Sequence, residues 1–279
     1  MLQKIMIEER KCEFIAMKIN KNNYFSPKAN FEYMGVSQYK QFMKCEAAAM
    51  AELREEYKPE MITALLVGSY VDAYFEGTLE NFVAEHPEIL KRDGTLKADY
   101  VQAENIINRV KQDELFMKFM SGRKQVIKTA ELFGTKWKIK IDSYFPKDKI
   151  VDLKIMRSLE RIMGRSFVDY WGYDIQMAVY SEIERLSTPA QNKYLETYLA
   201  VATKETPTDL ELIHIPLWRR KEVLQEVEKN MPRILAVKSG KEEPHRCGTC
   251  AYCRATKKLT EPIDFELVGL TAEERRMIQ

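Results

Sequence analysis

Three strand-like segments follow one another almost without interruption between residues 125 and 155, and this run limits the possible folds more than any other feature. Segments 125–133, 136–145 and 149–155 have the composition of β-strands, and the short sequences FGT and PKDK between them read as turns. Strands joined by so few residues can pair as antiparallel hairpins. The run therefore predicts a sheet at the centre of the chain.

The segments on either side predict a mixed α/β fold without repeats. We expect helices over 37–56, 61–77, 99–120, 159–186 and 218–237, and two further strands over 194–203 and 210–217. We expect residues 1–279 to form a single domain, with a helical cap over about 30–120, a core over 121–237 and a cysteine-rich segment over 238–262.

Composition excludes several classes of protein. Of the 279 residues 45% are hydrophobic, which is ample for a large core, and the net charge is only +2. A nucleic-acid partner would therefore need a local basic groove rather than a basic protein. No apolar run is long enough for a signal peptide or a membrane span, so we expect an intracellular protein with no membrane partner. No glycine loop of the Walker type is present, so we expect no ATP-driven motor in this chain.

Two aspartates interrupt the predicted strands. Side chains alternate faces along a strand, so Asp142 lies on the opposite face from Ile141, whereas Asp152 and Lys154 share a face. If the strands pair as a hairpin, the two carboxylates can converge beside the lysine. Two such carboxylates suit Mg²⁺ or Mn²⁺, and the lysine can hold a phosphate oxygen or orient water. The alternative is an edge hairpin with ordinary exposed charges.

Three short motifs, in this order along the chain, resemble those of a known nuclease superfamily. DLK at 152–154, ten positions after Asp142, resembles the PD-(D/E)xK signature. WGYDIQMAVY at 171–180 resembles the Q-x-x-x-Y motif of RecB-like nucleases, and GSYVDAYFEG resembles their G-x-x-x-H motif with Asp72 in place of histidine. Together the motifs resemble the phage-type exodeoxyribonuclease VIII branch, which is related to lambda exonuclease and to CRISPR-associated RecB-like nucleases. The resemblance covers roughly residues 35–260.

The resemblance implies a restriction-endonuclease-like α/β core, a mixed sheet flanked by helices, with Mg²⁺ or Mn²⁺ as cofactor. It implies that Asp142 and Asp152 are the main metal ligands, that Lys154 is the catalytic lysine, and that Glu131 is a further acidic residue of the core. Gln176 and Tyr180 lie four residues apart on one helix face, where they could reach DNA phosphate or brace the lysine. Asp72 would bind metal or support the site. For Glu131 the alternative is an exposed strand residue, and for Tyr180 a core aromatic residue.

The cysteines form a separate candidate site. Cys247, Cys250 and Cys253 follow a C-x-x-C-x-x-C pattern, which favours metal binding in a reducing compartment over disulfides. Cubane iron–sulfur clusters need four cysteines, and Cys45 is the candidate fourth; several RecB-like nucleases resemble this arrangement. Zinc, with Cys45 or His245 completing the set, and cysteines without metal are the alternatives. Cys12 falls outside the pattern.

The function that the resemblance implies is digestion of one DNA strand from linear duplex ends, in the cytoplasm of a bacterium or a phage-infected cell. An annealing recombinase is the expected partner, and an oligomeric ring or the helical cap would enclose the DNA. The alternatives are a structure- or site-specific endonuclease on the same core and a catalytically inactive, cysteine-stapled DNA-binding module.

Overall fold

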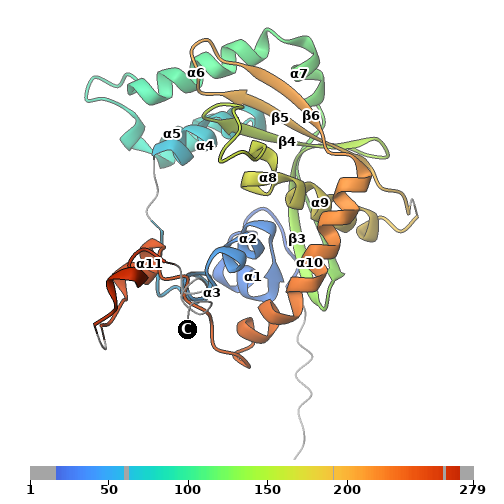
Figure 1. Ribbon diagram of the computed structural model, residues 1–279. Helices are drawn as coiled ribbons and strands as arrows, with labels where there is room; N and C mark the ends of the chain where they lie inside the picture. The colour runs from blue at the N-terminus through green and yellow to red at the C-terminus, as the bar shows by residue number, and fades with distance from the viewer. Residues whose placement is uncertain (1–16, 60–62, 191, 260–261, 271–279) are drawn as a thin grey trace, which may run out of the picture.

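The computed structural model describes residues 17–59, 63–190, 192–259 and 262–270. Its centre is a six-stranded sheet in the order β1-β3-β4-β5-β6, with β2 also paired to β3 (Figure 1). The strands are β1 (Tyr33–Met34), β2 (Arg123–Leu132), β3 (Thr135–Phe145), β4 (Lys149–Met156), β5 (Glu196–Thr203) and β6 (Leu210–His214). The three consecutive strands predicted from the sequence are β2, β3 and β4.

The sheet is mixed, as the predicted α/β fold requires. β3 is antiparallel to β2 and β4, whereas β4 and β5 are parallel and are joined through helices. β6 closes one edge antiparallel to β5, and the short β1 is parallel to the start of β3.

Helices cover both sides of the sheet. They are α1 (Pro27–Glu32), α2 (Val36–Lys44), α3 (Glu46–Leu53), α4 (Thr63–Glu76), α5 (Leu79–Glu85), α6 (Ala98–Lys111), α7 (Glu114–Phe119), α8 (Phe167–Trp171), α9 (Tyr173–Ser187), α10 (Leu217–Lys238) and α11 (Ala251–Ala255), with 3₁₀ turns η1 (Pro87–Ile89) and η2 (Phe265–Leu267). No helix among the described residues is both long enough and apolar enough to span a membrane.

Two hydrophobic cores lie against the sheet. In one, α4, α6 and α7, from the C-terminal part of the span predicted as a cap, pack on Val151 and Leu153 of β4 and Ala200 of β5. In the other, α2, α3, α9 and α10 pack on buried residues that include Trp137 and Ile139 of β3. Helices of the N-terminal part therefore contribute to both cores.

The helix predicted over 37–56 is wrong in one respect, because two helices occupy this span. α2 and α3 are separated at Cys45, whose backbone is extended at φ −166° and ψ 105°. The residues on either side favour helix, so local propensity gave no sign of the break. The break turns the Cys45 thiol toward the C-terminal cysteines, where it contacts Cys253.

Two other predicted helices are also divided. In the span 99–120, Asp113 starts a new helix, because its side chain accepts a hydrogen bond from the Phe116 N–H at 2.9 Å. In the span 159–186, helix begins only at Phe167 and is divided at Gly172, whose φ of +62° is left-handed.

Candidate active site and cysteine cluster

The two strand aspartates lie where β3 and β4 part. The antiparallel ladder between these strands ends at the pair Ser143–Val151, immediately before Asp142 and Asp152. In place of the next backbone hydrogen bond, the N–H of Leu153 donates to Oδ2 of Asp142 at 3.0 Å. The carboxylate thus replaces a strand partner, which explains how a charged residue is accommodated here.

Asp152 is almost fully buried, with 2% of its surface exposed, and two side chains hold its carboxylate. Gln176 of α9 donates to Oδ1 at 2.6 Å, and Lys154 forms an ion pair with Oδ2. Oδ2 accepts no hydrogen bond with acceptable geometry from the described residues. A buried carboxylate oxygen of this kind is suited to a cation.

Asp142 is half-buried beside it. Gln125 of β2 donates to its Oδ1 at 3.3 Å. Burial, followed by the charges of Asp152 and Asp72, raises the pKa of Asp142 well above its usual value. Carboxylates that disfavour each other's ionisation are stabilised by a divalent cation, which neutralises their charge.

Asp72 approaches this pair from α4. Burial, together with the charges of Asp152 and Glu76, raises its pKa to about 7, although Lys154 opposes the shift. The structure therefore places Asp72 in the electrostatic field of the two strand aspartates. The oxygen atoms of the three carboxylates are not all close enough to one another to provide a preformed metal site. Among the described residues, the four cysteines are the only group of three or more whose ligand atoms are this close.

Two lysines lie over one aromatic ring at the site. Nζ of Lys154 is 5.0 Å and Nζ of Lys40, on α2, is 5.3 Å from the ring centre of Tyr173. Burial opposes ionisation of Lys154, but the nearby Asp152 and Asp142 charges raise its pKa above the usual value, so it stays protonated. Sequence reasoning missed both Lys40 and Tyr173, because no motif marks them.

The structure does not bring Glu131 to this group. Glu131 is exposed and pairs with Lys136 near the β2–β3 turn. It lies six residues along β2 from Gln125, or about 20 Å at the usual rise of a strand. The tight turn at Phe133–Gly134, where both residues have positive φ, fixes this pairing. Counting residues outward from that turn could have identified Gln125 as the residue opposite Asp142.

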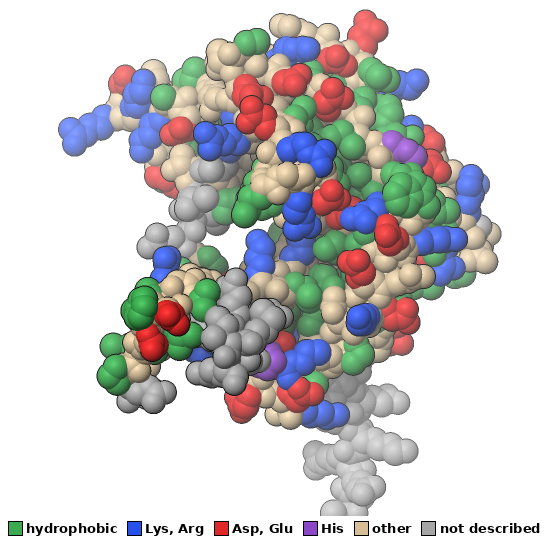
Figure 2. All heavy atoms as spheres, viewed as in Figure 1, with side chains coloured by type: hydrophobic (Ala, Val, Ile, Leu, Met, Phe, Trp, Pro, Cys, Tyr) green, Lys and Arg blue, Asp and Glu red, His purple; other side chains and the backbone are tan. Residues whose placement is uncertain are grey.

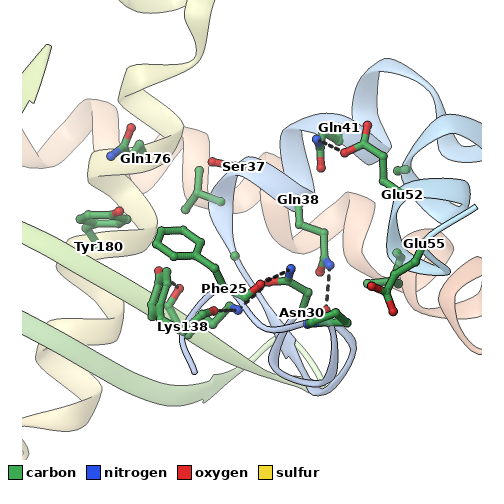
Figure 3. Close-up of a pocket in the computed structure, with 16 residues that line it drawn as sticks. Phe25, Asn30, Ser37, Gln38, Gln41, Glu52, Glu55, Lys138, Gln176 and Tyr180 are labelled. Atoms are coloured by element: carbon green, nitrogen blue, oxygen red, sulfur yellow. Dashed lines mark hydrogen bonds between the residues drawn. The ribbon is translucent and has the colours of Figure 1, made fainter. Parts of the chain in front are cut away.

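Gln176 and Tyr180 lie one helical turn apart on α9, as predicted. Both line a cavity whose other walls include residues of α1, α2 and α3 (Figure 3). Tyr180 is 9% exposed, so it is a core residue on one side and a cavity wall on the other.

The four predicted cysteines meet although more than 200 residues separate Cys45 from Cys253. Their sulfur atoms all lie within 4.8 Å of one another, with 3.5 Å between Cys45 and Cys253. Thiolates around one tetrahedral zinc ion lie about 3.8 Å apart, given Zn–S bonds of about 2.3 Å. A cubane separates its thiolates by roughly 6 Å, because an iron atom stands behind each of them. The spacing fits a single ion better.

Backbone N–H groups donate hydrogen bonds to the cysteine sulfur atoms. The N–H of Cys250 donates to Sγ of Cys247 at 3.3 Å, and that of Cys253 to Sγ of Cys250 at 3.4 Å. Burial opposes ionisation of Cys247, but donors from Cys250 and Thr249 lower its pKa to about 6, whereas burial raises the pKa of Cys45 and of Cys250. A thiol that ionises near neutral pH is ready to bind metal. Cys12 lies outside the described residues.

The segment that carries the three cysteines is fastened to α3. Glu46 forms an ion pair with Arg233 of α10 at 2.7 Å and accepts a hydrogen bond from the His245 N–H at 2.7 Å. The His245 side chain is outside the group of sulfur atoms, so Cys45 is the fourth member. Figure 1 shows α11 beside α3.

Comparison with known proteins gives a family and similar solved structures. Residues 35–256 match the family described as "PDDEXK-like domain of unknown function (DUF3799)". A crystal structure of a "Putative exonuclease" from Eubacterium rectale is 48% identical, with a TM-score of 0.86 over 91% of this chain and 99% of that chain. The structure of SSO0001 is 13% identical over 81% of this chain and 96% of that chain, and its TM-score of 0.31 is too low to indicate a shared fold. No curated protein matches the chain.

Proposed function

The chain belongs to the DUF3799 family of PDDEXK-like domains and is a PD-(D/E)xK nuclease, and we propose that it is a metal-dependent exonuclease that degrades one strand from the ends of linear duplex DNA. The observation that carries the proposal is the buried carboxylate of Asp152, held between Gln176 and Lys154 and next to Asp142. The similar structure from Eubacterium rectale, described as a "Putative exonuclease", favours attack from ends.

We propose that Asp142 and Asp152 hold Mg²⁺ or Mn²⁺, and that Asp72, which interacts electrostatically with both, supports the site. The ion would lower the pKa of bound water and stabilise charge on the phosphate. Gln176 keeps the Asp152 carboxylate in one orientation. Lys154 stays cationic, so it donates hydrogen bonds to a phosphate oxygen or to the attacking water and does not act as a base.

DNA would enter between the cap and the part of the molecule that carries α2. Figure 2 shows Lys and Arg side chains around a hollow between these parts. Lys40 lies beside the catalytic group and is suited to contact a phosphate next to the one that is cut. The net charge of the whole protein is only +2, so DNA binding requires a local group of basic residues. The Lys and Arg side chains around the hollow in Figure 2 are such a group.

The biological setting follows from this reaction. A product with one strand removed is a substrate for an annealing recombinase, which is the proposed partner in a bacterial or phage-infected cytoplasm. Enclosure of the DNA, under the cap or in an oligomeric ring, would keep the enzyme on its substrate.

The test is digestion of end-labelled linear, nicked and covalently closed circular DNA, with Mg²⁺ and with EDTA. We expect linear duplex to be degraded from its ends, closed circles to be spared, and EDTA to stop the reaction. Equal cutting of closed circles would replace this proposal by an endonuclease. No cleavage of any DNA with Mg²⁺ or Mn²⁺ would leave a DNA-binding module.

We also propose that the cysteine cluster holds one zinc ion with a structural role. The spacing of the sulfur atoms supports zinc over the iron–sulfur cluster that the sequence resemblance implies. Metal analysis and the visible spectrum of protein purified without oxygen decide between them. We expect one zinc per chain and no colour, whereas four irons with broad visible absorption would overturn the zinc assignment.

A further inference from the structure

A cavity of about 400 Å³ is linked to the proposed active site through Gln176. Gln176, which donates to Asp152, and Tyr180 form one wall, and residues of α1, α2 and α3 form the others (Figure 3). The volume lies within the range of small-ligand sites. A group in the cavity would therefore contact the residue that holds the carboxylate of Asp152.

The cavity walls do not suit a phosphate group. Lys138 is the only Lys or Arg among the lining residues, and its ammonium group already contacts the backbone oxygen of Tyr24 and Oδ1 of Asn30. The carboxylates of Glu52 and Glu55 also line the cavity and would repel an anion. The walls therefore disfavour an anionic group.

The remaining walls combine amide groups with an exposed aromatic ring. Gln41 donates to Glu52 at 2.7 Å, which leaves its own carbonyl oxygen and the second carboxylate oxygen as acceptors. The hydroxyl of Ser37 makes no hydrogen bond with any described residue. Phe25 is 70% exposed and lies between Tyr180 and Asn30 in Figure 3. Lys140 Nζ lies 5.0 Å from the ring centre of Phe25 and Tyr24 packs against the ring edge to face, yet most of the side chain stays exposed. A partly exposed ring beside unused hydrogen-bonding groups matches the flat, polar-edged shape of a nucleobase.

We propose that this cavity receives the nucleobase of the nucleotide next to the scissile phosphate, stacked on Phe25 with its edge toward Gln41 and Glu52. The inference rests on the proposed function, because it places the base relative to the phosphate at Asp152 and Lys154. It adds that the enzyme holds its strand by a base as well as by phosphates, so that the terminal base pair must open before cleavage.

The test uses duplexes in which a single abasic site stands at successive positions of the digested strand. Base stacking contributes roughly 5- to 100-fold in affinity, so we expect the wild-type protein to cleave more slowly by about this factor when the abasic site reaches the cavity. Phe25→Ala should slow cleavage of intact DNA by a similar factor and remove the effect of the abasic site. Phe31→Ala is the matched control, because Phe31 is 53% exposed on α1 but does not line the cavity.

A second measurement does not depend on cleavage. A strand with 2-aminopurine near its end, bound in EDTA, should lose fluorescence when the base stacks in the cavity, and Phe25→Ala should prevent the loss. Intact and abasic DNA cleaved at equal rates, or fluorescence unchanged by Phe25→Ala, would overturn the base-binding proposal. Failure of the proposed function is a different result, namely no cleavage of intact DNA by the wild-type protein.

Discussion

Gln176 fixes the carboxylate of Asp152: its amide nitrogen, on α9, donates to Oδ1 on β4 at 2.6 Å. The hydrogen bond joins the helix that follows the catalytic hairpin to the strand that carries the signature aspartate. The other carboxylate oxygen faces Lys154, so the orientation of the group is set from two sides. The glutamine of the Q-x-x-x-Y motif thus contacts Asp152, the proposed metal ligand.

Replacing Gln176 by Leu should weaken metal binding more than it weakens folding. The substitution keeps the size of the side chain but removes the donor to Asp152, and loss of such a supporting contact costs about 10- to 100-fold in metal affinity or activity. A Mg²⁺ titration of cleavage should show a higher half-saturating concentration. An unchanged Mg²⁺ dependence with a lower maximal rate would mean that Gln176 acts on DNA instead.

Asp152→Ala and Lys154→Ala should each reduce cleavage by about 100- to 1000-fold or more, because they remove a metal ligand and the cationic donor at the phosphate. Glu131→Ala should keep near-normal activity, since Glu131 is exposed near the opposite end of the hairpin. Initial rates and circular dichroism of the three variants check this. Loss of activity in Glu131→Ala with an intact fold would contradict the placement.

Asp72→Asn should stabilise the metal-free protein in a pH-dependent way. The folded-state pKa of Asp72 is about 7, above its usual value of 3.8. The folded state therefore favours the protonated carboxyl, and the resulting gain in the free energy of unfolding is fully present only below about pH 4 and is lost as pH rises toward 7. The variant has no such group. Its advantage in the free energy of unfolding should therefore grow from pH 4 to pH 7, to about 1–4 kcal/mol, and then level off.

Urea unfolding in EDTA measures this difference for Asp72→Asn. Glu80→Gln, an exposed acidic residue on α5, is the control and should follow the wild-type curve. Mg²⁺ should stabilise the wild-type protein more than Asp72→Asn. Parallel pH curves for the wild type and Asp72→Asn would show that Asp72 is not held at a raised pKa.

DNA binding in EDTA should weaken as pH rises through about 8, because Lys40 then loses its proton. Burial, followed by the nearby charge of Lys154, lowers the pKa of Lys40 from 10.5 to about 8. Lys40→Arg keeps its charge throughout and should bind DNA equally well at pH 7 and pH 9. Lys44→Arg, one turn farther along α2 and exposed, should retain the wild-type pH dependence. Fluorescence anisotropy with labelled duplex measures all three proteins.

Cys250→Ser should release the metal and lower the melting temperature by roughly 10 °C or more, because the bound ion stabilises only the folded state. Metal content and thermal unfolding should change together, and a chelator should reproduce the effect in the wild type. Cys12→Ser should change neither, since Cys12 falls outside the C-x-x-C-x-x-C pattern and four other cysteines already complete a set of ligands. Full metal content in Cys250→Ser would remove Cys250 from the site.

The sequence was most informative where a short-range rule decides the structure. Strand alternation and tight turns predicted the three central strands and the meeting of Asp142 with Asp152. The spacing of four residues likewise placed Gln176 and Tyr180 on one side of α9. These features depend on backbone periods that do not change with tertiary context.

Features that depend on distant contacts were not predictable. The break between α2 and α3 occurs among good helix formers and is accompanied by the contact between Cys45 and Cys253. Lys40 reaches the site only because this break and the packing of α2 on α9 set its position. A motif search cannot find such a residue, since nothing in its own neighbourhood differs from an ordinary surface helix.

The position of Cys45 also sets the order in which the protein can mature on the ribosome. Its partner Cys253 lies 208 residues downstream, so the cluster cannot close until all six strands of the sheet and helices α2 to α10 have been made. α2, which carries Lys40 to the proposed active site, ends next to this cysteine. During synthesis the sheet can therefore form before the four sulfur atoms meet, and closing the cluster joins α3 to a segment made much later.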